Sequence, residues 1–145
     1  MGNVAIVVAS HGEFAKYALD SAQMIVGEQD NCGSMSVTMD LTLDEAKKNM
    51  AQVIRELDCS NGLVILVDIF GGTPSNVSGN FILEDDNVLV LSGLNLPMLI
   101  ELLLNRDKPL DQIARQLEEA YKQGFTNINQ LFKERGEEDD ECQIL

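Results

Sequence analysis

Four short apolar runs, each ending at polar residues or glycine, alternate along this chain with segments of helical periodicity. Runs of about five or six aliphatic and β-branched residues are typical of strands buried on both faces of a sheet. Strands that alternate with helices need crossover connections, which favour a mainly parallel sheet. The predicted strands cover residues 4–9, 34–39, 63–67 and 87–91.

Apolar residues at helical spacing fill the segments between these runs, as at Phe14, Ala18, Met24 and Ile25. Thr42, with Glu45 three positions later, forms a capping box that marks another helix start. The expected fold is therefore a doubly wound α/β sheet with helices on both faces, for which we take 2-1-3-4, a common strand order of this class, as the expected order. Helices are predicted over residues 14–26, 42–57, 96–104 and 110–123, with a short one after 71–76, and residues 126–132 form a possible antiparallel fifth strand.

The length of 145 residues predicts one domain with a full core. Five methionines are expected to fill that core, namely Met24, Met35, Met39, Met50 and Met98.

The charge of the chain is strongly acidic, with 24 acids against 10 bases and a net charge of −14. Such a chain lacks the basic face that nucleic acids and anionic membranes need. Residues 134–145 hold six acids and one base, which leaves −9 for residues 1–133. Residues 1–133 are predicted to form the domain and 134–145 a disordered acidic tail. The acidic body favours a basic protein partner.

The residues that bind metals are scarce. The chain has three cysteines, an odd number, at the widely spaced positions Cys32, Cys59 and Cys142, and it has one histidine. This pattern argues against a disulfide framework and against a zinc site, and it fits a reducing cytoplasm. No apolar run reaches the 18 residues that a membrane span needs. We therefore expect no metal and no cofactor.

His11, the only histidine, follows the first predicted strand directly, and Asp68 ends the third. In the order 2-1-3-4 these strands are neighbours, so both side chains reach the edge where such sheets place ligands. A carboxylate that accepts the Nδ1 proton of imidazole fixes the tautomer and leaves Nε2 free as a nucleophile. The pair therefore predicts a histidine that accepts a phosphoryl group.

Two further loops lie at the same edge of the predicted sheet. Gly71 and Gly72 let the backbone approach a ligand, the hydroxyls of Thr73 and Ser75 can donate hydrogen bonds, and a helix N-terminus follows. These four residues are predicted to bind the phosphoryl group. The residues predicted to shape the pocket are Ser10, Ser92, Gly93 and Asn95.

Three motifs in this order resemble the enzyme IIA domain of the mannose family of the bacterial phosphoenolpyruvate:sugar phosphotransferase system. They are residues 6–12 (IVVASHG), 66–76 (LVDIFGGTPSN) and 92–99 (SGLNLPML), within a resemblance that covers residues 3 to about 130. The resemblance implies that His11 carries the phosphoryl group on Nε2, that Asp68 orients His11, and that Thr73 helps to hold the group.

The resemblance also implies partners for this chain. Phosphate is expected to come from the phosphocarrier protein HPr and to pass to a histidine of enzyme IIB. IIB then phosphorylates a sugar that enters through membrane components IIC and IID. Because no IIB-like segment follows, IIB is expected on a separate chain. The resemblance further implies a cytoplasmic homodimer, peripherally associated with the transporter, with residues 126–132 as the candidate exchanged strand.

Three other functions compete with this one. The phosphotransfer subunit of dihydroxyacetone kinase shares the fold and the histidine but has a different loop after the third strand. A receiver-like domain phosphorylated on Asp68 needs an acidic pair at the end of the first strand, where this chain has Ala9, Ser10 and His11. A hydrolase built on Ser10, His11 and Asp68 lacks a nucleophile elbow.

Overall fold

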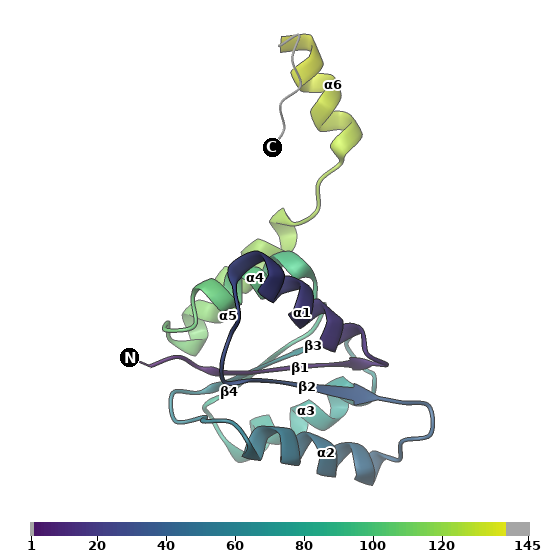
Figure 1. Ribbon diagram of the computed structural model, residues 1–145, viewed down its shortest axis with the longest axis vertical. Helices are drawn as coiled ribbons and strands as arrows, with labels where there is room; N and C mark the ends of the chain where they lie inside the picture. The colour runs from purple at the N-terminus through teal and green to yellow at the C-terminus, as the bar shows by residue number, and fades with distance from the viewer. Residues whose placement is uncertain (1, 139–145) are drawn as a thin grey trace.

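The computed structural model describes residues 2–138, in which four parallel strands form one sheet of order β2-β1-β3-β4 (Figure 1). Both the order and the parallel direction agree with the prediction from the sequence. The described part of the chain contains no fifth strand. The strands are β1 (Ala5–His11), β2 (Cys32–Val37), β3 (Leu63–Val67) and β4 (Val88–Leu91).

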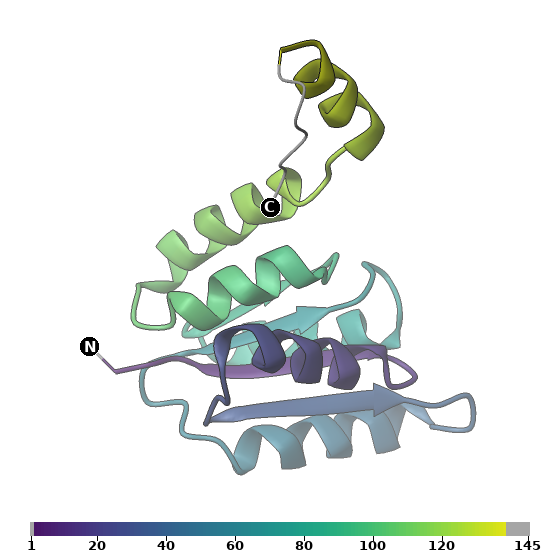
Figure 2. The ribbon, with the colours of Figure 1, turned by 45° about the horizontal axis from the view of Figure 1, so that its top comes forward.

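Helices cover both faces of the sheet, as Figures 1 and 2 show. One face carries α1 (Phe14–Val26), α4 (Leu96–Leu104) and α5 (Leu110–Gln123). The other carries α2 (Leu43–Arg55) and α3 (Thr73–Glu84). The doubly wound α/β fold is thereby confirmed.

The sheet is held by two apolar layers, one beneath each set of helices. β3 is buried along its whole length, and β1 is buried as far as Ser10. Each aliphatic side chain buried in this way contributes about 1.5–3 kcal/mol to folding. The capping box of α2 is present, because the Glu45 amide donates to Thr42 Oγ1 (3.2 Å) and the Thr42 amide donates to Glu45 Oε1 (3.4 Å).

The register of β1 and β3 brings two chemically active residues together at the carboxyl edge of the sheet. Ala9 pairs with Val67, so His11 lies two residues beyond this pair and Asp68 one residue beyond it. The Asp68 amide donates to the Ala9 carbonyl (3.2 Å), which continues the pairing past β3. The site is thus a consequence of strand order and register.

The opposite edge of the sheet is tied together by Arg106, which is buried. Its guanidinium donates to the carbonyls of Val4 (2.8 Å), Asp30 (2.7 Å) and Asn31 (3.1 Å). These bonds join the segment after α4 to the starts of β1 and β2, so Arg106 serves the fold, far from the site.

The prediction of a strand over residues 126–132 was wrong. These residues enter α6 (Ile128–Glu138), which projects away from the sheet and its helices (Figures 1 and 2). Ile128, Leu131 and Phe132 follow helical spacing, and Asn127 Oδ1 accepts from the Gln130 amide (3.1 Å) at the helix start. α6 runs past Lys133, so residues 134–138 are helical where a disordered tail was expected; residues 139–145 lie outside the described part of the chain.

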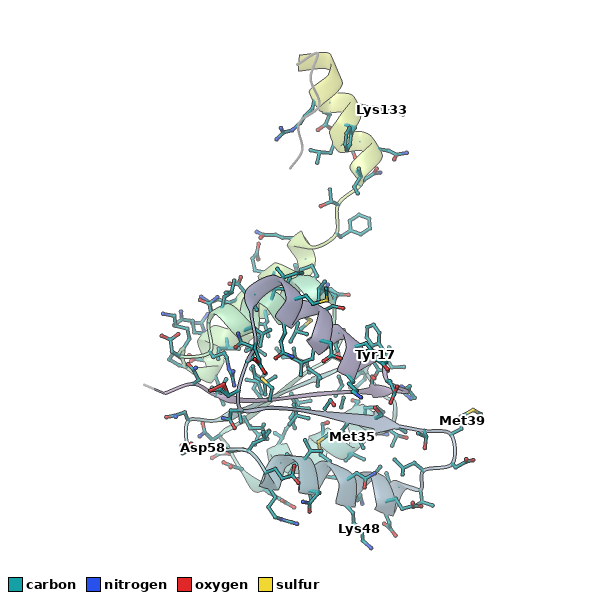
Figure 3. All side chains as sticks on the ribbon, in the orientation of Figure 1. Tyr17, Met35, Met39, Lys48, Asp58 and Lys133 are labelled. Atoms are coloured by element: carbon teal, nitrogen blue, oxygen red, sulfur yellow. The ribbon has the colours of Figure 1, made fainter. Side chains whose placement is uncertain are left out.

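The prediction that all five methionines fill the core was correct for three of them. Met35, Met50 and Met98 are buried, whereas Met24 and Met39 are exposed. Figure 3 shows Met39 on the turn after β2, pointing away from the sheet, and Met35 beside α2. Residues 39–40 form a turn, so the Met39 side chain has no helix or strand to pack against.

The buried face of α1 also differs from the apolar spacing that predicted this helix. Phe14, Met24 and Ile25 are exposed, whereas the buried residues are Ala15, Leu19 and Ala22. Small side chains let α1 lie close to the sheet, and the larger apolar residues are left on its outer side.

Candidate active site

The centre of the site is the contact between His11 and Asp68. Asp68 Oδ2 accepts from the main-chain amide of His11 (3.0 Å) and lies 2.8 Å from Nδ1 of its ring. The His11 side chain is 49% exposed, and that of Asp68 is 13% exposed. A carboxylate in this position selects the tautomer with the proton on Nδ1, and no hydrogen bond from a described residue reaches Nε2. Nε2, on the opposite side of the ring from Asp68, is therefore not engaged by these residues at the edge of the sheet.

The Asp68 carboxylate is kept ionised by its hydrogen bonds. Burial alone raises the pKa of Asp68, but the main-chain and ring hydrogen bonds from His11 and the hydrogen bond from the Ile69 amide outweigh it and lower that pKa below its ordinary value. Since the pKa is depressed in the folded state, Asp68 stabilises the fold above about pH 4, and this contribution is lost as the pH falls through the folded-state pKa. At neutral pH the carboxylate is thus available to hold Nδ1–H.

The loop that precedes α3 packs directly on the His11 ring. A Cβ added to Gly72 would lie 2.6 Å from Cε1 and 3.1 Å from Nε2 of His11, so only glycine leaves room for the ring there. Gly71 has a φ of +90°, a left-handed conformation that favours glycine. Gly72 is the N-cap of α3, Thr73 is its first residue, and Ser75 lies two positions later in the first turn. Of the four residues predicted to bind the phosphoryl group, Gly72 therefore lies against the ring, and the other three adjoin it in the chain at the N-terminus of α3, a position suited to anions.

The loop after β4 supports Asp68 through its backbone. The Gly93 amide donates to the Asp68 carbonyl (3.2 Å), and Asn95 Oδ1 caps α4 by accepting from the Met98 amide (3.0 Å). Ser92 lines a cavity between β4 and α5. Four residues were predicted to shape the pocket, and of the three that lie in this loop, Gly93 has the direct link to the central pair.

Ser10 holds the turn between β1 and α1. It is buried, and its hydroxyl accepts from the Ala15 amide (2.8 Å) and donates to the Gly12 carbonyl (3.1 Å). The hydroxyl is therefore occupied by backbone groups. This arrangement argues against a hydrolase with Ser10 as its nucleophile.

Four exposed apolar side chains follow His11 or Asp68 closely in the chain, and the sequence analysis assigned none of them to the site. We call Phe14, Tyr17, Ile69 and Phe70 the apolar collar; all four are exposed. Phe14 and Tyr17 also line a groove of about 320 Å³ between α1 and the start of α4, and Figure 3 shows Tyr17 on the outer side of α1. Large apolar residues exposed together mark interaction surfaces. The sequence could have indicated this surface, because Phe14 and Tyr17 follow His11 within six positions and Ile69 and Phe70 follow Asp68 directly.

Within residues 2–138, no group of three or more histidine, cysteine, aspartate or glutamate residues is placed to hold a metal ion. Among the helices in this range, none combines the length and apolarity that crossing a membrane requires.

Comparison with known proteins places the chain in a family. Residues 5–131 match the family described as PTS system fructose IIA component (EIIA-man). The chain belongs to this EIIA family. It is 29% identical over 123 residues to the PTS system fructose-specific EIIA component of Bacillus subtilis (strain 168), a match that covers 84% of each chain. It is 33% identical over 104 residues to the PTS system mannose-specific EIIAB component of Escherichia coli (strain K12). That match covers 72% of this chain, which spans about a third (32%) of the E. coli protein.

Solved EIIA structures share the fold. The mannose/sorbose-specific IIA subunit of Enterococcus faecalis superposes with a TM-score of 0.79 at 30% identity, covering 87% of this chain and 95% of that one. The PTS IIA protein associated with the fucose utilization operon of Streptococcus pneumoniae gives 0.76 at 30% identity, with 89% and 96% covered. The resemblance to the mannose family is thereby confirmed, and no finding supports the dihydroxyacetone kinase subunit.

Proposed function

We propose that this EIIA protein is a phosphoryl carrier, in which Nε2 of His11 accepts the group from phospho-HPr and passes it to a histidine of enzyme IIB. The observation that carries the proposal is the bond between Asp68 Oδ2 and Nδ1 (2.8 Å) beneath a half-exposed ring. In the first transfer the Nε2 lone pair forms a bond to phosphorus while the nitrogen–phosphorus bond of phospho-HPr breaks and its electron pair returns to the HPr ring. In the second transfer a ring nitrogen of the IIB histidine forms the new bond to phosphorus while the Nε2–phosphorus bond breaks and its electron pair returns to the His11 ring. Positioning contributes most of the rate of such a step.

The surroundings of Nε2 suit a phosphoryl group that must leave again. The N-terminus of α3, with Thr73 and Ser75, offers amide and hydroxyl donors to the phosphoryl oxygens. Lysine and arginine are absent from the three loops at this edge, residues 10–12, 68–76 and 92–97. A neutral cradle holds the anion more weakly than charge-assisted bonds do, which keeps the group transferable.

The proposal is tested by incubating the protein with phosphoenolpyruvate, enzyme I and HPr. We expect one phosphate per chain, labile in acid and stable in base, as a phosphohistidine is. Adding an enzyme IIB should remove this phosphate from the protein. An acid-stable phosphate, or none at all, would contradict the proposal.

The apolar collar is the proposed docking surface for HPr and IIB. It lies next to His11, and the acidic body of the protein favours basic partners. Because the phosphoryl group moves between proteins, the site needs no contact with a sugar; components IIC and IID would take part only through IIB.

We place the protein in the cytoplasm, at the periphery of the transporter, and assign the carrier function to residues 1–133.

Asp68→Ala is expected to slow phosphoryl transfer on the order of 100-fold, because the ring loses the partner that fixes its tautomer. The fold should persist, since Asp68 keeps its backbone bonds to Ala9 and Gly93. Transfer rates are measured by rapid quench, and the fold by circular dichroism. The matched control is Asp86→Ala, an exposed acid at a distance from the site. A wild-type rate in Asp68→Ala would remove Asp68 from the mechanism.

We further propose that the protein is a homodimer held by residues 125–138. In this dimer, the segment 125–138 of each copy packs against the other copy. Phe125 is 85% exposed and Ile128 is also exposed on this projecting segment, and β4 leaves one strand edge open. Phe125→Asp combined with Ile128→Asp should convert a dimer to a monomer in sedimentation velocity. Leu83→Asp, an equally exposed apolar site on α3, is the control. A monomeric wild type, or a dimer that survives the double substitution, would contradict this arrangement.

A further inference from the structure

We propose that Tyr121, on α5, is a positioning residue for His11 and Asp68, and that it acts through the loop that follows β4. Tyr121 belongs to none of the three loops at the site, and the inference rests on the proposed function of that pair. The path runs from the Tyr121 ring to Gly93, from Gly93 to Asp68, and from Asp68 to His11.

The first step is the contact between Tyr121 and Gly93. Gly93 has a φ of +84°, and a Cβ added there would lie 3.1 Å from Cε2 and 3.6 Å from Cζ of the Tyr121 ring. The ring therefore lies directly against the glycine backbone. Its position limits how far this loop can move toward α5.

The second step is the pairing of this loop with the end of β3. The Gly93 amide donates to the Asp68 carbonyl (3.2 Å), and the Leu94 amide donates to the Val67 carbonyl (3.0 Å). Because the Asp68 amide donates to Ala9 on the other side, both backbone groups of Asp68 are held. The loop thus fixes the backbone from which the Asp68 carboxylate reaches His11.

The third step is the anchoring of the loop by the end of α5. Asn95 Nδ2 donates to the Tyr121 carbonyl (3.5 Å), and a Cβ on Gly124 would lie 2.6 Å from Pro97 Cγ. Beside the ring lies a cavity of about 440 Å³ that Ser92 and Leu117 also line. Without the ring, this cavity extends to Gly93, and the loop has room to move away from Asp68.

The Asp68–His11 bond is sensitive to such movement, because a hydrogen bond weakens steeply once its distance and angle leave the favourable range. Tyr121 is 47% exposed, so its truncation removes little of the buried core. We therefore expect its main effect on the histidine tautomer, with a smaller one on the stability of the fold.

The test uses the full chain with Tyr121→Ala, and Tyr121→Leu as a second truncation. Because His11 is the only histidine, its two ring ¹⁵N signals can be assigned without ambiguity. In the wild type we expect the neutral ring to carry its proton on Nδ1. In both truncations we expect a mixture of tautomers and transfer from phospho-HPr that is slowed about tenfold. Tyr121→Phe keeps the ring and should restore both properties.

Glu118→Ala, an exposed position one turn earlier on α5, is the matched control and should behave as wild type. Wild-type tautomer signals and rates in both truncations would overturn the inference, as would an equal loss in Tyr121→Phe. If the truncations shift the tautomer but the wild type accepts no phosphate, the positioning role of Tyr121 holds and the proposed function is contradicted instead. A lower melting temperature with unchanged ring signals would make Tyr121 merely structural and would also overturn the inference.

Discussion

Phosphorylation of the protein by phospho-HPr is expected to disappear when His11 is replaced by alanine. No other histidine exists in the chain, so no second imidazole can take over the group. The loss should be complete, because nucleophile and phosphoryl acceptor are the same atom. It is measured as phosphate incorporated per chain after incubation with phosphoenolpyruvate, enzyme I and HPr.

His11→Gln distinguishes the loss of the nucleophilic nitrogen from the loss of side-chain packing. A glutamine amide fills similar space and can donate a hydrogen bond to Asp68, but it cannot carry a phosphoryl group. Both variants should therefore be inactive while their circular dichroism matches that of the wild type. Phosphate that persists in either variant would assign the acceptor to another residue.

Gly72→Ala is expected to lower the transfer rate on the order of 100-fold, a loss as large as that expected for Asp68→Ala. The added methyl would lie 2.6 Å from His11 Cε1, so the ring or the loop must shift. A displacement of about 1 Å at a reacting group can cost a factor of that size. The rate of transfer from phospho-HPr measures the effect, and the shift of the ring should appear in the ¹⁵N spectrum of His11.

Gly79→Ala is the matched control for this substitution. Gly79 lies in α3, where an added Cβ meets no atom within 4 Å, and alanine favours helix more than glycine does. This variant should transfer phosphate at the wild-type rate and be slightly more stable. Equal rates in the Gly72 and Gly79 variants would show that the space beside the ring is not needed.

The sequence predicted the fold well because its strands are local, strongly apolar patterns. The runs at 63–67 and 4–9 match β3 and most of β1, and their alternation with helices indicated a mainly parallel sheet. The order 2-1-3-4, one of the common orders of such sheets, is the one observed. The site followed from that order, since His11 and Asp68 each end a strand and neighbouring parallel strands end at one edge. The contact between His11 and Asp68 could therefore be predicted from their positions at the ends of these strands.

Other features depend on tertiary contacts that apolar spacing does not encode. Phe14 and Met24 were expected to mark the apolar face of α1, yet both are exposed, and Ala15, Leu19 and Ala22 are the buried residues of this helix. The support that Tyr121 gives to Gly93 joins residues 28 positions apart, and no local motif marks it. The helix of residues 128–138 was missed because its short apolar pattern also resembles weak alternation.

The central claim is that a phosphoryl group resides on Nε2 of His11 while Asp68 holds Nδ1. The most direct test is ³¹P–¹⁵N NMR of uniformly ¹⁵N-labelled protein after phosphorylation by phospho-HPr. We predict that the phosphorus couples to Nε2 of His11 and that Nδ1 remains protonated. Coupling to Nδ1, or a phosphate on any other residue, would contradict the account.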